Sequence, residues 1–140
     1  MIVLDTSVVL AFMDRRDANH ALVREWMHMQ EQELITTPLV LAELDHLVSR
    51  QGGVDAARAL YEDLERGAYF VEWWSTATHE TIAAAECHRS MALGLTDASL
   101  LALAARLRTT AIATLDERHF RACKPAGGEA AYTLLPADAH

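Results

Sequence analysis

Short runs of β-prone apolar residues alternate with longer helical segments along the whole chain, and no hairpin turn joins two of these runs. The runs are expected to be strands, at residues 2–4, 34–36, 69–73, 111–115 and 132–135. Strands that are connected through helices run parallel to one another. The alternation therefore predicts an α/β fold, with a short, mostly parallel five-stranded sheet flanked by helices.

The helical segments are bounded by capping and stop signals. Helices are expected at residues 8–12, 18–32, 38–50, 54–65, 76–93 and 96–107. Thr37 can cap a helix that has Pro38 at its first position, and Gly52 and Gly53 end that helix. Thr96 is expected to cap the last helix. The two helices before the third strand leave the sheet as a helical hairpin that projects or packs against a partner.

Size and composition predict a single domain spanning residues 1–140. With 51% hydrophobic residues, the chain can bury a core without disulfides or metal. Cys87 and Cys123 lack ligand or CxxC spacing, so we expect reduced thiols in a cytoplasmic protein. No apolar run approaches the roughly 18 residues of a membrane helix. The apolar start contains Asp5 and Asp14 and lacks a basic leader, which argues against a signal peptide.

The net charge of −8 argues against a general nucleic-acid binder, because such proteins carry a basic stripe. Any contact with a phosphate backbone is therefore expected to depend on bound cations or on local basic residues. Arg118, Arg121 and Lys124 form one such local group.

Acidic residues stand at three places where a parallel α/β fold puts its ligands. Asp5 ends the first strand and Asp116 follows the fourth, so both are expected at the same edge of the sheet. Asp97 falls in the first turn of the helix at 96–107. The helix dipole also favours an acid at that position, so Asp97 taken alone is explained equally well without a site.

Glu43 is expected on a buried helix face. Leu39, Val40 and Leu47 stand at i−4, i−3 and i+4 from it, which places Glu43 in the middle of the apolar stripe. A carboxylate there is costly unless it is paired or binds a metal. A buried ion pair, or a side chain that reaches solvent from the end of the stripe, is the ordinary alternative.

Four carboxylates in one cleft would repel one another unless a divalent cation compensated their charge. Oxygen ligands favour Mg²⁺ or Mn²⁺, and the natural reaction of such a site is phosphodiester hydrolysis. Thr6, Ser7 and Thr114 lie beside these acids and are expected to support Asp5 or a bound water.

Other constellations predict less. Glu43 with His46 and Asp116 with His119 have the spacing of carboxylate-bridged iron sites, but such sites need a bundle of four long helices, which the strand signals oppose. His46 and His119 are therefore interpreted as surface or partly buried structural residues. The three tryptophans are expected to pack in the core or at a dimer contact rather than to stack on bases. They are Trp26, Trp73 and Trp74.

Four motifs together resemble a PIN domain, and more specifically the VapC-type toxins of bacterial and archaeal toxin–antitoxin pairs. They are Ile2-Val-Leu-Asp-Thr-Ser7, Leu41-Ala-Glu-Leu44, Thr96-Asp97-Ala98 and Thr114-Leu-Asp-Glu-Arg-His-Phe120. The resemblance covers essentially the whole chain and implies the PIN sandwich of a parallel sheet with helices. It implies that Asp5 and Asp97 are the main metal ligands, assisted by Glu43 and Asp116, with Ser7 supporting Asp5.

The resemblance also implies an activity and partners. The expected activity is Mg²⁺- or Mn²⁺-dependent endoribonuclease cleavage of RNA. The expected partners are a second copy in a homodimer and a cognate, VapB-like antitoxin whose tail can place a basic residue among the carboxylates. Two alternatives stay open: a housekeeping PIN nuclease in RNA maturation, and a non-catalytic PIN-fold interaction module.

Overall fold

The sheet is fully parallel and has five strands in the order β3-β2-β1-β4-β5. The computed structural model describes residues 1–139. The strands are β1 (Ile2–Leu4), β2 (Leu34–Thr36), β3 (Phe70–Val71), β4 (Ala111–Ala113) and β5 (Thr133–Leu135). The helices are α1 (Thr6–Met13), α2 (His20–Met29), α3 (Pro38–Glu65), α4 (Ala77–Cys87), α5 (Leu95–Leu107) and α6 (Glu117–Ala122). The predicted α/β architecture is confirmed.

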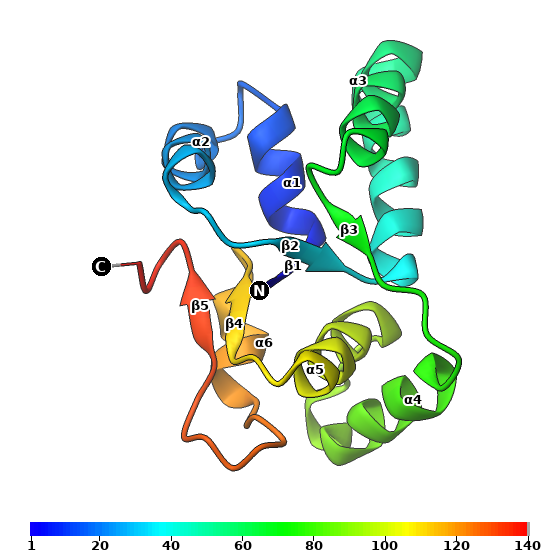
Figure 1. The fold of residues 1–140 in the computed structure, drawn as a ribbon, viewed down its shortest axis with the longest axis vertical. Helices are drawn as coiled ribbons and strands as arrows, with labels where there is room; N and C mark the ends of the chain where they lie inside the picture. Colours follow the sequence, from blue (N-terminus) through cyan, green and yellow to red (C-terminus); the bar gives the residue numbers. More distant parts are fainter. Residues whose placement is uncertain (140) are drawn as a thin grey trace.

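Helices cover both faces of this sheet, which gives three layers (Figure 1). The chain first adds strands outward from β1 to β3 and then crosses back to β4 and β5. Because crossover connections are right-handed, the reversal places α1 to α3 on one face and α4 to α6 on the other, as Figure 1 shows. No helix in the described part of the chain is both long enough and apolar enough to cross a membrane.

The first strand forms the centre of the sheet and of the core. Ile2, Val3 and Leu4 are each at most 1% exposed, and β1 pairs with β2 on one side and β4 on the other. The strand order reverses between β1 and β4, which is where open α/β sheets form ligand crevices. The backbone N–H of Asp5 donates to the carbonyl of Ala113 over 3.0 Å, so the two strand ends lie side by side.

Several element boundaries differ from the predictions. Gly94, and not Thr96, is the N-cap of α5, although Asp97 is in the first turn as expected. The strand predicted at 69–73 is only the two-residue β3, and the helix predicted at 76–93 ends at Cys87 before a 3₁₀ turn at Arg89–Met91. The sequence patterns did not predict α6, because six residues are too few for a periodic signal.

The helical hairpin before β3 is present and turns at Gly53. The α3 segment is continuous from Pro38 to Glu65 except at Gly53, whose φ of 73° and ψ of −165° are not helical. The chain rises along the first half of α3 and returns along the second (Figure 1). Thr37 caps the start as predicted, since its side chain accepts a hydrogen bond from the Val40 amide over 3.2 Å.

Replacing Gly53 with Ala should destabilise the fold by about 1–3 kcal/mol, because this backbone conformation is almost confined to glycine. Gly94 provides the matched control, since its φ of −68° is open to any residue. A Cβ built at either glycine meets no described atom within 4 Å, so the pair separates backbone strain from crowding. Urea unfolding measures both variants. Equal stability of Gly53→Ala and Gly94→Ala would contradict the strained turn.

Candidate active site

Asp5 is held in place at the junction of β1 and α1. It is only 6% exposed and is the N-cap of α1, where one carboxylate oxygen accepts a hydrogen bond from the Thr6 amide over 2.7 Å. The other oxygen accepts from the hydroxyls of Ser7 (2.7 Å) and Thr114 (2.8 Å). The buried strand β1 and these three hydrogen-bond donors together fix the direction of the Asp5 carboxylate.

Ser7 and Thr114 also tie Asp5 to the end of β4. The Ser7 hydroxyl accepts from the Leu115 amide over 2.9 Å, and the Thr114 hydroxyl accepts from the Asp116 amide over 3.0 Å. Each hydroxyl therefore links Asp5 to the segment that carries Asp116. Thr6, by contrast, supports Asp5 only through its backbone, since its buried hydroxyl finds no hydrogen-bond partner among the described residues.

Asp97 enters the same region from the first turn of α5, where it is half-buried. Ser99, two residues later, is buried and shares a hydrogen bond of 2.8 Å with the hydroxyl of Thr37. Thr37 is the cap of α3, so this buried pair joins the starts of α3 and α5. Glu43 lies in the first turns of α3 and Asp97 in the first turn of α5, so the pair of hydroxyls helps to position both acids. This pair was not predicted from the sequence.

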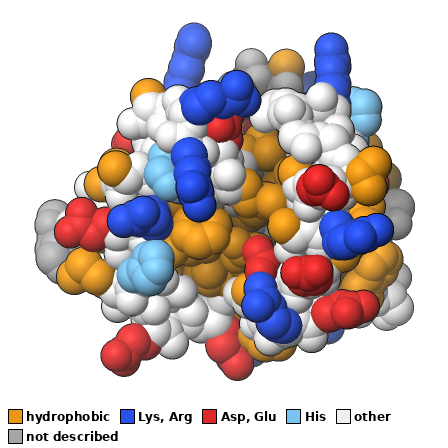
Figure 2. Space-filling model, turned by 90° about the horizontal axis from the view of Figure 1, so that it is seen from above, with side chains coloured by type: hydrophobic (Ala, Val, Ile, Leu, Met, Phe, Trp, Pro, Cys, Tyr) orange, Lys and Arg blue, Asp and Glu red, His pale blue; other side chains and the backbone are white. Residues whose placement is uncertain are grey.

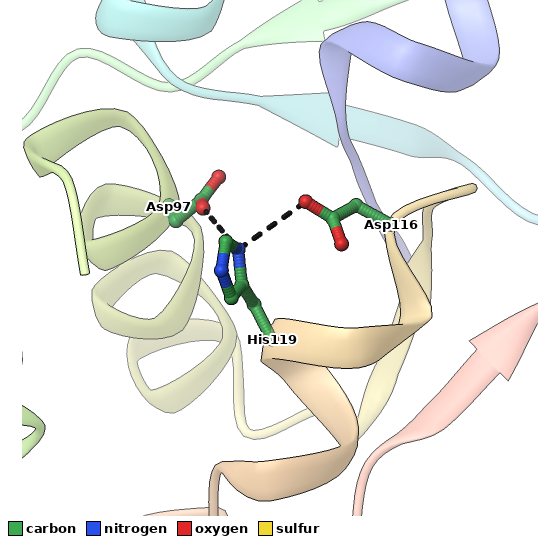
Figure 3. A group of neighbouring side chains, drawn as sticks. All are labelled: Asp97, Asp116 and His119. Carbon is green, nitrogen blue, oxygen red and sulfur yellow. Dashed lines mark ion pairs between the residues drawn. The ribbon is translucent and has the colours of Figure 1, made fainter. Parts of the chain in front are cut away.

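Asp116 and His119 complete the cluster from α6. Asp116 is the exposed N-cap of this helix and His119 lies one turn later. The His119 Nδ1 atom is 3.2 Å from Asp116 Oδ2 and 3.5 Å from Asp97 Oδ2, as Figure 3 shows. The structure therefore places His119, interpreted from the sequence as a surface or partly buried structural residue, beside two of the candidate metal ligands. A histidine one turn after a candidate ligand was the available signal, whereas His46 is exposed on α3 as expected.

Glu43 is not in the middle of a buried stripe, so that prediction is wrong. The buried residues of the first half of α3 are Val40, Leu44 and Val48, and Leu39 is 40% exposed. Glu43 lies half-buried on the flank of this stripe. Glu43 is nevertheless close enough to the cluster for its charge to raise the pKa of both Asp5 and Asp97.

The carboxylates disfavour one another's ionisation. Burial raises the pKa of Asp5, against the opposing effect of the hydrogen bonds from Ser7, Thr114 and Thr6. Burial also raises the pKa of Asp97, and the charges of Asp5, Asp116 and Glu43 add to it while His119 opposes it. A protein that retains several carboxylates at mutual cost has a site suited to a cation.

Donor chemistry and spacing in this cluster fit a divalent metal ion. Asp97, Asp116 and His119 each offer a ligand atom, and the three atoms lie within 4.8 Å of one another. Asp5 lies outside this group of three but interacts electrostatically with Asp97. Carboxylate oxygens together with one imidazole nitrogen form a donor set typical of Mn²⁺ and related ions.

The raised pKa values give a testable dependence of stability on pH. The ordinary pKa of an aspartate is about 3.8, and the pKa values of Asp5 and Asp97 are raised above it in the folded state. As the pH rises above about 3.8 without metal, the folded state therefore keeps more protons on these two residues than the unfolded state does. The free energy of unfolding therefore falls through this window, and it should fall less in Asp97→Asn. With saturating Mn²⁺, the free energy of unfolding of the wild type should instead rise relative to that of Asp97→Asn as the pH increases, because a cation needs ionised ligands. Urea unfolding at a series of pH values measures this, and parallel profiles without metal would contradict it.

Comparison with known proteins agrees with this architecture. The PIN domain family matches residues 2–125. Ribonuclease VapC26 of Mycobacterium tuberculosis strain H37Rv is 38% identical over 135 residues, which are 96% of this chain and 99% of that protein.

Two crystal structures share the fold at 21% sequence identity. VapC20 of Mycobacterium tuberculosis, described as a Sarcin-Ricin loop cleaving toxin, has a TM-score of 0.73 over 80% of this chain and 87% of its own. FitAcB of Neisseria gonorrhoeae has a TM-score of 0.58 over 83% of this chain and 88% of its own. The chain therefore belongs to the PIN domain family and, within it, to the VapC ribonucleases.

Proposed function

We propose that this chain is the toxin of a toxin–antitoxin pair and acts as a divalent-metal-dependent endoribonuclease. The single observation that carries this proposal is that Asp5, Asp97 and Asp116 meet at one edge of the sheet. The chain that brings them together is 38% identical to a VapC ribonuclease. A non-catalytic module of the same fold would have no reason to keep carboxylates that raise one another's pKa.

The residues have distinct parts in this reaction. Asp97 and Asp116 would hold the cation with Asp5, and Glu43 would act from the flank of α3. When bound, Mg²⁺ or Mn²⁺ supplies charge to neutralise the phosphodiester and to activate water. Ser7 and Thr114 keep the Asp5 carboxylate turned to the site through their hydrogen bonds. The buried Thr37–Ser99 pair keeps α3 and α5 in register.

RNA is the proposed substrate, in line with the relative Ribonuclease VapC26 and with the structural neighbour VapC20, a Sarcin-Ricin loop cleaving toxin. Because the net charge is −8, attraction of RNA depends on the cation and on local basic residues. Arg121 is committed elsewhere, since it forms ion pairs with Glu117 (2.9 Å) and Asp138 (2.6 Å). Arg118 is exposed and lies between Asp116 and His119 in the chain, so it is the basic residue of this group next to the site. Lys124 is also exposed but lines a cavity with Ala105 and Arg108, towards the other end of α5.

An antitoxin and a second copy of the chain are the proposed protein partners. Figure 2 looks onto the side of the molecule that carries α1, α2 and the α3 hairpin, and shows apolar side chains near the centre with charged side chains around them. A cavity of about 230 Å³ opens between α1 and α3 and is lined in part by Leu10, Met13 and Val48. Val54 on α3 and Trp73 after β3 are over 70% exposed and are apolar side chains that a partner could cover. Of the three tryptophans, only Trp26 is fully in the core.

The activity is tested with purified protein freed of any partner. We expect RNA cleavage with Mg²⁺ or Mn²⁺, none after chelation with EDTA, and recovery when the ion is restored. The exposed Asp55 on the second half of α3 provides a control, since Asp55→Asn should cleave like the wild type. Cleavage that survives EDTA would refute the metal mechanism, and a folded, metal-loaded protein without cleavage would favour the non-catalytic module.

The toxin assignment is tested in cells. Expression of this chain alone should arrest growth, and co-expression of a small neighbouring antitoxin gene should restore it. A housekeeping nuclease would leave growth unaffected at the same expression level. Asp5→Asn should be tolerated without the antitoxin if growth arrest comes from RNA cleavage.

A further inference from the structure

His119 is aimed into the acidic cluster by the helix that carries it. Asp116, the N-cap of α6, and His119 are three positions apart, so they lie on the same side of this helix. Phe120, the next residue, is fully buried and is the one buried residue of this helix. Its burial fixes the rotation of α6, which turns the imidazole towards Asp97 on the facing helix (Figure 3).

The spacing of the three donor atoms matches shared coordination. Nδ1 of His119 lies 3.2 Å from Asp116 Oδ2 and 3.5 Å from Asp97 Oδ2. In an octahedral site with bonds of about 2.1 Å, neighbouring ligand atoms are roughly 3.0 Å apart. The two histidine–carboxylate distances thus lie within a few tenths of an ångström of those for adjacent positions around one ion, and the two carboxylate oxygens lie within 4.8 Å of each other.

Apart from its ion pairs with these two carboxylates, the Nδ1 atom has no partner among the described residues. Nδ1 of His119 is buried, and it makes no hydrogen bond to any residue that the structure describes, although the imidazole side chain is 43% exposed. The lines to the two carboxylates diverge from it on either side (Figure 3). Three other histidines place Nδ1 against a backbone carbonyl at 2.6–2.9 Å: His20, His28 and His88. His119 departs from this pattern, and its Nδ1 atom faces two carboxylates instead.

We infer that His119 contributes an imidazole nitrogen to the same cation as Asp97 and Asp116, and that the site therefore prefers Mn²⁺ to Mg²⁺. This inference rests on the proposed metal-dependent function and adds a ligand to it. Imidazole binds Mn²⁺ and later transition ions readily, whereas Mg²⁺ keeps oxygen ligands and waters. The exposed edge of the ring leaves Nε2 to carry the proton while Nδ1 binds.

Pulsed electron paramagnetic resonance of the Mn²⁺-loaded protein tests this ligand directly, without RNA. Electron spin-echo modulation should show ¹⁴N coupling from a bound imidazole in the wild type, and His119→Gln should lose it. The exposed His46 gives the control, since His46→Gln should keep the coupling. Calorimetric titration should show Mn²⁺ affinity falling about 10-fold or more in His119→Gln, with Mg²⁺ affinity little changed.

The outcomes separate this inference from the proposed function. Mn²⁺ bound by wild type without ¹⁴N coupling would overturn the histidine ligand and leave the acidic metal site standing. Coupling that persists in His119→Gln would overturn it as well. Failure of the wild type to bind Mn²⁺ or Mg²⁺ at millimolar concentration would overturn both.

Discussion

Asp5→Asn should lower the rate of RNA cleavage by about 100-fold or more while raising the stability of the metal-free protein at neutral pH. Activity falls because an amide cannot supply the negative charge that the cation requires. Stability rises because burial has raised the pKa of Asp5, so the ionised carboxylate costs the fold free energy at pH 7. The amide can keep the hydrogen bond from Thr6, and the hydroxyls of Ser7 and Thr114 can each accept from its nitrogen.

A fall in activity together with a rise in stability is expected only where a carboxylate serves function at the cost of stability. Cleavage is measured with saturating Mn²⁺ and stability by urea unfolding with EDTA. Asp55→Asn, which removes an exposed carboxylate far from β1, should change neither. A variant that loses activity and stability together would show that Asp5 acts only as the cap of α1.

Phe120→Ala should destabilise the protein by about 3–5 kcal/mol, the range for removing a buried aromatic ring. Phe120 is 0% exposed, and α6 has only six residues, too few to be stable without tertiary contacts. Loss of the ring should free α6 and thereby displace both Asp116 and His119. Mn²⁺ affinity should fall with stability even though no ligand has been replaced.

Urea unfolding and calorimetric titration measure the two effects of this change. Arg118 lies on the same helix and is exposed, so Arg118→Ala should alter stability by at most about 0.5 kcal/mol. Phe120→Leu should lie between the two. A loss below about 1 kcal/mol in Phe120→Ala would mean that contacts other than this ring hold α6 in place.

The sheet and three of its acids were predictable because they depend on short-range rules. Apolar β-prone runs gave the strands, and the parallel connections brought Asp5 and Asp116 to one edge. The first turn of α5 holds Asp97 as expected, although Gly94 rather than Thr96 caps that helix. A shift of two residues at a helix start is below what capping preferences can distinguish.

The rest of the site depends on tertiary packing. Leu39, Val40 and Leu47 suggested a buried stripe around Glu43. Val40 is buried, but α3 otherwise packs through Leu44 and Val48, the residues that follow Glu43 and Leu47. Helical spacing gives the relative positions of side chains and not which face meets the core. His119 was set aside because a lone histidine is usually structural, and its approach to Asp97 depends on a short helix that sequence patterns do not reveal.

We propose that a divalent cation binds where β1, β4 and the start of α5 meet. Anomalous diffraction from crystals soaked in Mn²⁺ tests it most directly, because the peak locates the ion without reference to activity. We predict one strong peak within bonding distance of Asp97 and Asp116, beside Asp5, that is absent in Asp97→Asn crystals. A saturated crystal with no peak at this edge, or with its only peak elsewhere, would contradict the account.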